Sequence, residues 1–232
     1  GATRVQRISE RLVDTLVDLH AVDYQAVGLA DFGRPEGYLA RQVGRWKKQL
    51  EASRSRPIAG IDELAERLTN NVPTDSAATI VHGDFRLDNV LIDTENNDQI
   101  TAVLDWEMST LGDPLTDLAI MLAYQQLALH DSMTAAVVTD ASNAAGYLAP
   151  AEVIERYASG SGRNVDELGF YLGLAYFKLA VILEGIYLRF SQGKTLGEGF
   201  ENMGAMIDPQ TRLDYLKKFG VGQGTATIIE RV

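Results

Sequence analysis

The sequence contains no cysteine, and this absence excludes several kinds of chemistry. Disulfide bridges, thiolate zinc sites and cysteine nucleophiles are all ruled out. A chain without disulfides also fits a reducing compartment, so we expect a cytoplasmic protein.

Long hydrophobic runs are missing as well. A membrane-spanning helix needs about 18 or more apolar residues with few or no charges. The nearest stretch, from Leu168 to Leu188, is interrupted by Lys178 and Glu184. We therefore expect a buried core helix here and no membrane partner. Within that helix, Lys178 is expected either to extend toward solvent or to pair with an acid.

Positive charge is in the minority, with a net charge of −11, which argues against general nucleic-acid binding. Between Arg34 and Arg56, however, seven basic residues face only two acids, a local charge of +5. Three of the basic residues, Arg41, Arg45 and Lys48, share one helical face. This basic stripe has two open interpretations: a solvated face, or a surface that recognises an anion such as a phosphate-bearing acyl carrier like CoA.

Helical periodicity dominates the sequence, and hydrophobic residues at 46% permit a sizeable core. The first part of the chain predicts helices at roughly 3–20, at Tyr38–Ser53 and at Ile61–Leu68. After "GDP" at 112–114, with Asp113 as the N-cap, everything is expected to be helical. Breaks are expected near Gly146–Pro150, Ser159–Arg163 and Gln192–Gly199.

Short β-branched runs lie between these helical regions, at Ala78–Val81, Val90–Ile92 and Ile100–Leu104. The polar turn between the last two predicts an antiparallel hairpin. The fold class is therefore mainly α (α+β): a helical domain with a small antiparallel β hairpin that carries the polar residues.

The segment "IVHGDFRLDNVLID" at 80–93 places many polar side chains between two apolar runs. Asn89 lies just before the first strand of the hairpin and Asp105 just after the second. These strand ends meet at one edge of an antiparallel pair, and Asp84 lies on the loop that leads there. Two carboxylates and an amide oxygen suit a hard cation such as Mg²⁺.

Phosphoryl transfer to a hydroxyl needs this set of groups: a carboxylate that accepts the hydroxyl proton, and oxygen ligands for the metal that holds the phosphates. We accordingly assign Asp84 as the catalytic base, and Asn89 and Asp105 as ligands of Mg²⁺ and, through it, of the nucleotide.

Three motifs, "HGDFRLDN", "LDWE" and "GDPLTDLA", resemble the aminoglycoside phosphotransferase family of kinase-like enzymes. The chain looks most similar to the branch related to acyl-CoA dehydrogenase-associated phosphotransferase domains. "LHAVD" (19–23) and "RQVGRWKKQLEASR" (41–54) extend the resemblance over most of the chain. The resemblance implies the same roles for Asp84, Asn89 and Asp105.

Other polar residues near these motifs keep more than one interpretation. His82 is expected to support the loop backbone. Asp117 either braces that loop or favours the helix N-terminus. Arg86 either contacts the γ-phosphate or an anionic substrate, or forms a surface ion pair. Glu107 is either a neighbour of the metal site or an exposed turn acid.

The resemblance also implies a second, β-rich lobe that grips the nucleotide. Only 81 residues precede His82, and they predict helices. We therefore expect residues 1–232 to form a single C-terminal kinase-like lobe, part of something longer, with little activity alone. The surface left by the absent lobe is expected to favour a homodimer.

The expected function is transfer of phosphate from ATP or GTP to a hydroxyl of a small molecule. Gly83 stands where regulated protein kinases have the Arg that holds a phosphorylated activation loop. Too few residues separate Asp105 from Asp113 for such a loop. Both features favour a constitutive small-molecule kinase over a protein kinase. The acceptor stays open; the basic stripe favours an anionic or CoA-linked one. The alternative is a non-catalytic module that binds a ligand or partner through a relic site.

Overall fold

The computed structural model describes residues 1–74, 78–95, 98–130 and 141–194. Its helices and strands, in chain order, are α1 (Ala2–Ala21), α2 (Tyr38–Ser53), α3 (Ile61–Asn70), β1 (Thr79–Val81), β2 (Val90–Asp93), β3 (Gln99–Val103), β4 (Thr110–Gly112), α4 (Leu115–His130), α5 (Pro150–Ser161) and α6 (Leu168–Ser191). Short 3₁₀ turns occur at Leu87–Asn89, Trp106–Met108 and Ala141–Asn143.

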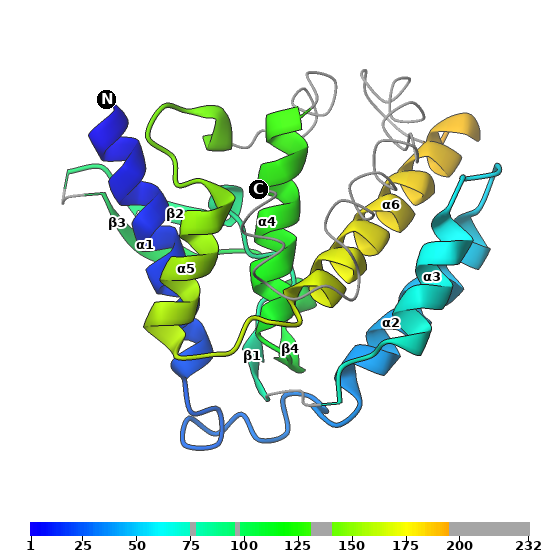
Figure 1. The fold of residues 1–232 in the computed structure, drawn as a ribbon, viewed down its shortest axis with the longest axis horizontal. Helices are drawn as coiled ribbons and strands as arrows, with labels where there is room; N and C mark the ends of the chain where they lie inside the picture. The colour runs from blue at the N-terminus through cyan, green and yellow to red at the C-terminus, as the bar shows by residue number, and fades with distance from the viewer. Residues whose placement is uncertain (75–77, 96–97, 131–140, 195–232) are drawn as a thin grey trace.

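The helices form two groups on either side of α4 (Figure 1). On one side α1 lies beside α5; on the other, α2 and α3 pack against α6, which also packs against α4. The amphipathic α1 buries Leu12, Val13 and Leu16 in the core. This arrangement makes α4 and α6 the central elements of the core.

Helix α1 is held by partners that come much later in the chain. The Arg156 guanidinium on α5 donates to the Asp14 carboxylate at 2.7 Å. Before α5, the Leu148 N–H donates to the Ser9 hydroxyl at 3.2 Å, and beyond it the Arg163 guanidinium donates to the His20 carbonyl at 3.0 Å. The first helix is therefore fixed largely by segments from the second half of the sequence.

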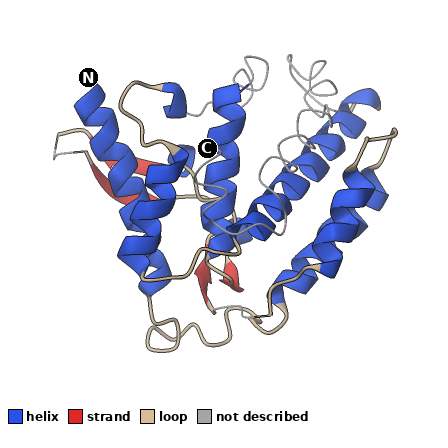
Figure 2. Ribbon diagram, in the orientation of Figure 1, coloured by secondary structure: helices blue, strands red, loops and turns tan. Residues whose placement is uncertain are grey.

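The strands form two small antiparallel sheets set among the helices (Figure 2). Strand β1 pairs with β4, with Ile80 opposite Leu111. Strand β2 pairs with β3, with Val90 opposite Val103 and an irregularity after Leu91. The predicted hairpin is therefore confirmed, and its register puts Asn89 and Leu104 opposite one another at its open end.

The tip of this hairpin is fastened to α1. Asp98 is buried, and its carboxylate accepts hydrogen bonds from Arg4 at 2.7 Å and from Arg7 at 3.1 Å. Burial alone raises the pKa of a carboxyl, but hydrogen bonds and charge from the two arginines outweigh it, so the pKa of Asp98 lies below its usual value of 3.8. A second contact thus joins the first helix to a distant segment.

The sequence predicted most of these elements. The helices over 3–20, Tyr38–Ser53 and 61–68 are confirmed within a few residues, and α2 has the predicted bounds. Asp113 caps α4 by accepting the Leu115 N–H at 3.0 Å, although the helix begins at Leu115 rather than at Pro114. Parts of the expected helical region, 131–140 and 195–232, and part of the hairpin turn lie outside the described residues.

One strand was not predicted. Residues 110–112 form strand β4, which is the partner of the predicted run at 78–81. The β4 segment Thr-Leu-Gly is too short to show alternation, and it runs directly into the helix start, so its identity depends on pairing with β1.

Helix α6 is long and apolar enough to cross a membrane, judged by length and composition alone. In the described residues it is the one such helix, yet 67% of its most apolar window is buried inside the molecule. It packs against α2, α3 and α4, which is the environment of a core helix. The prediction of a buried helix in this segment is confirmed.

Candidate active site

The loop between β1 and β2, residues 82–89, brings most of the predicted site residues together. It begins with a turn at Gly83, whose φ of 88° lies in the left-handed region. A Cβ atom at this position would lie 2.8 Å from the Cβ and carbonyl oxygen of Met108. Glycine is required here both by its conformation and by the close approach of the neighbouring segment.

Asp117 on α4 fixes the backbone of this turn through hydrogen bonds. Its fully buried carboxylate accepts the backbone N–H of His82 at 2.6 Å and that of Gly83 at 2.7 Å. It lies 3.3 Å from Nε2 of His20, and since a carboxylate can only accept, that nitrogen carries a proton. The other ring nitrogen of His20 forms a hydrogen bond with the Tyr157 hydroxyl at 2.8 Å.

The buried His82 ring supports the loop from within. Its Nε2 donates to the Leu104 carbonyl at 2.8 Å, so its Nδ1 is free to accept the Asp84 N–H at 3.2 Å. The ring also packs edge-on against Trp106, with 4.8 Å between centroids. His82 thus connects the loop to the segment that follows β3.

Asp84 is half-buried and lies beside Asn89. The Asn89 amide nitrogen donates to the Asp84 carbonyl at 2.8 Å and to its carboxylate at 3.3 Å. These bonds use the nitrogen of the amide and leave its oxygen for another ligand. The carboxylate of Asp84 is therefore oriented toward the open end of the hairpin.

Asp105 lies at the same end of the hairpin. The Leu104 N–H donates to the Asn89 carbonyl at 2.7 Å, which places Asp105 next to that strand end. Its backbone is left-handed, with φ 65°, and Asp tolerates this conformation better than most residues. Its carboxylate is exposed and has no hydrogen-bond partner within the described part of the chain.

Asn89 and Asp105 fit a magnesium ion that is shared with a nucleotide. Across the described ranges, no three His, Asp or Glu side chains gather into a metal cluster. Mg²⁺ in phosphotransfer sites is usually held by one or two carboxylates together with waters and substrate phosphates. The Asn89 oxygen and the unpaired Asp105 carboxylate suit such a site, and they do not suit a metal enclosed by protein ligands alone.

Arg86 is mostly buried and already has an ion-pair partner, unlike an exposed arginine that awaits a phosphate. It forms an ion pair with Asp88 and stacks over the Tyr124 ring, 4.2 Å from the centroid. Burial raises the pKa of Tyr124 to about 12, and the negative charge of Asp84 adds to the effect. The structure therefore places Arg86 beside Asp84, with its charge already balanced by Asp88.

Two more acids of this region are now placed. Glu107 lies in the 3₁₀ turn that follows Asp105, and it is exposed. Asp113, besides capping α4, accepts the Tyr171 hydroxyl at 2.8 Å. That bond ties α6 to the start of α4, so Asp113 is a structural residue.

A cavity of about 410 Å³ opens beside the loop, between α2, α6 and the segment 107–110. We refer to it as the α2–α6 pocket. It is lined by Arg34, Tyr38, Arg41, Gln42, Arg45, Trp46, Gly83, Glu107, Met108, Ser109, Thr110, Thr116, Asp117, Ile120, Tyr171, Leu174, Ala175 and Lys178. Four cations thus face two carboxylates, and that of Asp117 is occupied by the loop, which makes the pocket positively charged.

The basic stripe divides between two surfaces. Arg41 and Arg45 line the α2–α6 pocket, whereas Lys48 lines a separate hollow near α3. Arg41 also holds the preceding loop by donating to the carbonyls of Arg34 and Glu36. The stripe therefore does not act as one surface, because only part of it lines the α2–α6 pocket.

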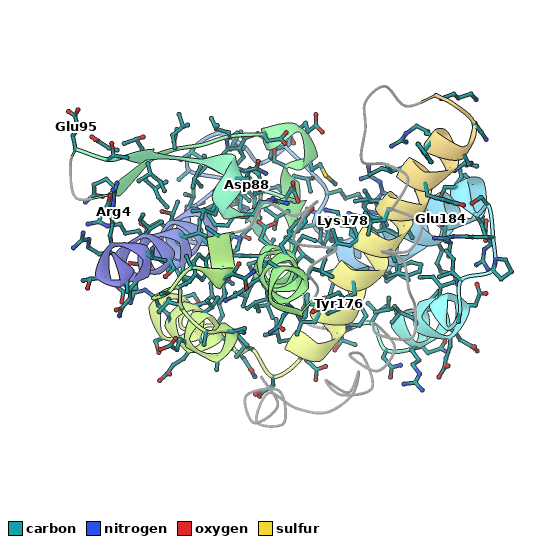
Figure 3. All side chains as sticks on the ribbon, turned by 90° about the horizontal axis from the view of Figure 1, so that it is seen from above. Arg4, Asp88, Glu95, Tyr176, Lys178 and Glu184 are labelled. Carbon is teal, nitrogen blue, oxygen red and sulfur yellow. The ribbon has the colours of Figure 1, made fainter. Side chains whose placement is uncertain are left out.

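Lys178 is a site residue that the sequence did not indicate as one. Its ammonium group donates to the Gly83 carbonyl at 2.6 Å and has no acid partner among the described residues. Figure 3 shows it on the side of α6 away from Glu184, whose buried carboxylate accepts the Ser55 N–H at 2.9 Å. A lone lysine in an apolar helix was the available signal, but the rotation of the helix could not be predicted.

Comparisons with known proteins identify the family and the fold of the chain. Residues 2–162 match the model of the phosphotransferase enzyme family. Acyl-CoA dehydrogenase family member 11 from Gallus gallus is 36% identical over 203 residues, which cover 85% of this chain and 26% of that protein. Family member 10 from Mus musculus is 32% identical over 222 residues, covering 94% and 21%. The chain thus spans about a quarter of the length of these relatives.

Solved structures give the same result for the fold. A crystal structure from Ralstonia eutropha, provisionally assigned as an aminoglycoside phosphotransferase, superposes with a TM-score of 0.82 at 31% identity, covering 94% of this chain and 67% of that one. A spectinomycin phosphotransferase with bound ADP and spectinomycin shares the fold at a TM-score of 0.54 and 16% identity, covering 92% and 65%. On these matches, the chain belongs to the phosphotransferase enzyme family typified by the aminoglycoside phosphotransferases.

Proposed function

We propose that the chain is the catalytic and acceptor-binding lobe of an ATP- or GTP-dependent enzyme that phosphorylates a hydroxyl of a small molecule. The observation that carries the proposal is the position of Asp84. Its backbone is held by His82 and Asn89, its carboxylate lies beside the Asn89 amide, and the preceding Gly83 lines the α2–α6 pocket. The Gly83 end of the pocket therefore lies one residue along the chain from a carboxylate that is already oriented.

In the proposed reaction, Asp84 takes the proton of the acceptor hydroxyl as the hydroxyl oxygen bonds to the γ-phosphorus. The bond between that phosphorus and its bridging oxygen breaks, and the nucleoside diphosphate leaves with the electron pair. A Mg²⁺ ion held by Asn89 and Asp105 would neutralise charge on the phosphates. Asp117 and His82 act on the backbone, keeping Asp84 at the pocket.

For Arg86 we propose a supporting role at the same carboxylate. Arg86 and Asp84 both contact Tyr124, so Arg86 holds this ring beside the base and supports the position of the carboxylate. A direct contact with the γ-phosphate would use guanidinium N–H groups other than the one that pairs with Asp88.

The nucleotide-binding half of the cleft is proposed to lie outside this chain. Among related structures of the same fold, one holds ADP and another holds GDP together with kanamycin, so both types of nucleotide occur in the family. We propose that residues 1–232 form the C-terminal lobe, and that the isolated chain has little turnover.

For the acceptor we propose a molecule with an anionic group, free or linked to CoA. Support comes from Arg34, Arg45 and Lys178, which line the α2–α6 pocket of a chain whose overall charge is −11. A cationic acceptor would meet this charge unfavourably. The lack of cysteine supports a proposed cytoplasmic location.

The test uses the full-length protein that contains this chain. Nucleoside diphosphate release is measured with ATP or GTP, Mg²⁺ and a panel of anionic hydroxy acids, neutral alcohols and cationic amino alcohols. We expect release that depends on an anionic acceptor, and a loss of about 10²–10⁴-fold in Asp84→Asn, because general base catalysis contributes that much.

The matched control is Asp18→Asn, which makes the same change at an exposed position on α1 and is expected to keep full activity. If no acceptor in the panel increases release, or if Asp84→Asn keeps wild-type turnover, the proposal fails. Ligand binding without any turnover would instead favour the non-catalytic module.

A further inference from the structure

Lys178 has an unusual environment for a lysine. It lies in the middle of α6, a helix whose neighbouring residues Phe177 and Leu179 are buried. Burial lowers its pKa, and the nearby charge of Asp84 opposes that shift only in part. Placing a charge here costs stability, so its position calls for a role beyond packing.

One reason for the position of Lys178 is its hydrogen bond to the catalytic loop. Its ammonium group accepts no bond and can donate three, and the shortest goes to the Gly83 carbonyl at 2.6 Å. Since Asp117 holds the N–H of Gly83 at 2.7 Å, the peptide groups on both sides of this glycine are fixed, one from α4 and one from α6. The next residue in the chain is Asp84.

The other reason for the position of Lys178 is that it lines the α2–α6 pocket. The Lys178 ammonium lies 5.6 Å from the centre of the Trp46 ring and 3.9 Å from the Met108 sulfur, both of which line the pocket with it. A ring face and a thioether are weak partners for a cation. In the described part of the chain no carboxylate forms an ion pair with Lys178, so its charge is open to an anion that enters from the pocket.

We propose that Lys178 is a positioning residue that couples the acceptor pocket to the catalytic base: one donor holds the Gly83 carbonyl, and another binds the anionic group of the acceptor. The inference rests on the proposed function and deepens it. Arg45, exposed at the pocket, assists by charge, because it has no ion-pair partner among the described residues. An acceptor without an anionic group would leave Lys178 unpaired and the Gly83–Asp84 peptide less firmly held.

The first test needs no turnover. Inorganic phosphate is titrated into the chain at constant ionic strength and followed by ¹⁵N NMR, with the Trp46 indole reporting the pocket and the Gly83 and Asp84 amides reporting the loop. In the wild type all three signals should move together. In Lys178→Met the affinity should fall about tenfold to a hundredfold, since a hydrogen bond to a charged group is lost, and the two loop amides should no longer respond.

The matched control is Lys48→Met, which removes a lysine that lines the separate hollow on α2 and should leave the titration unchanged. Wild-type phosphate affinity in Lys178→Met, or loop amides that still follow phosphate, would overturn the proposal. So would a wild-type chain in which phosphate moves none of the three signals.

A second test separates positioning from folding, using the full-length enzyme. Lys178→Met should raise the acceptor KM and lower kcat while the nucleotide KM is unchanged. Lys178→Arg keeps the charge and should restore the acceptor KM more than kcat, because a bulkier guanidinium cannot reproduce the short contact with Gly83. Equal changes in both KM values would show a structural role and overturn the proposal. A wild type without acceptor-dependent turnover would refute the proposed function, and the phosphate titration would still decide the role of Lys178.

Discussion

The Asp117 carboxylate shows how one buried residue can position a loop. Its two oxygens accept two consecutive backbone N–H groups, of His82 and Gly83, and His20 lies against it from α1. His82 and His20 are buried, so neither of their donors has an alternative partner if Asp117 is changed. The residue therefore matters for the loop through its accepting capacity.

At the residue scale we expect Asp117→Asn to destabilise the fold by about 2–3 kcal/mol, because the amide nitrogen cannot accept and leaves a buried N–H unsatisfied. Urea denaturation measures this change. The exposed Asp18→Asn variant should stay within about 0.5 kcal/mol of wild type. Equal midpoints for Asp117→Asn and the wild type would mean that the carboxylate does not hold the loop.

At the scale of elements, the β2–β3 hairpin is held at both ends. Its open end carries Asn89 and precedes Asp105, and its tip is fastened to α1 through Asp98. Asp98 is buried and its φ of 58° is left-handed, so the tip has a defined conformation. A movement of the tip would change the register that places the two metal-binding candidates together.

The Asp98 contact predicts a pH dependence. Its folded pKa lies below the unfolded value of 3.8, so the ionised form stabilises the fold at pH values above 3.8. This contribution is lost as the pH falls below 3.8 toward the folded pKa. Thermal unfolding of wild type and Asp98→Asn should therefore differ in Tm at pH 7, and the difference should be smaller at pH 3. A difference in Tm that is the same at both pH values would contradict the ion pairs.

Sequence patterns predicted the elements well where the signal is local. The bounds of α2 follow from apolar periodicity between Gly37 and Pro57, and the hairpin follows from two β-branched runs around a polar turn. Strand β4 and the contact of Lys178 with Gly83 were missed for one physical reason: both depend on how distant segments pack. The loop motif places Asp84 and Asn89 in the chain, but only tertiary structure shows that the neighbouring Gly83 lines the α2–α6 pocket.

At the scale of the whole molecule, one exposed face is apolar. Leu91 and Leu104 point to the same outer side of the hairpin, and they are 51% and 41% exposed. Trp106, at 40%, lies in the adjoining turn. Exposed apolar groups that cluster in this way usually meet another surface.

We expect the isolated chain to self-associate through this face, so its average mass in sedimentation should rise with concentration. Leu91→Lys should weaken the association because it places a charge within the contact. Val27→Lys is the control, since Val27 is 58% exposed but lies in the loop after α1. A chain that stays monomeric at high concentration would contradict the expectation.

The late partners of α1 have a consequence for the order of events during synthesis. Helix α1 leaves the ribosome well before Asp98, Arg156 and Arg163, which fix it and follow roughly a hundred residues or more later. An isolated helix of this length is only marginally stable in water. The apolar face of α1 must therefore remain unsatisfied, and open to chaperones, until α5 has emerged. The loop at 82–89 is held by Asp117, which lies against His20 on α1. This loop can therefore reach its final form only after that point.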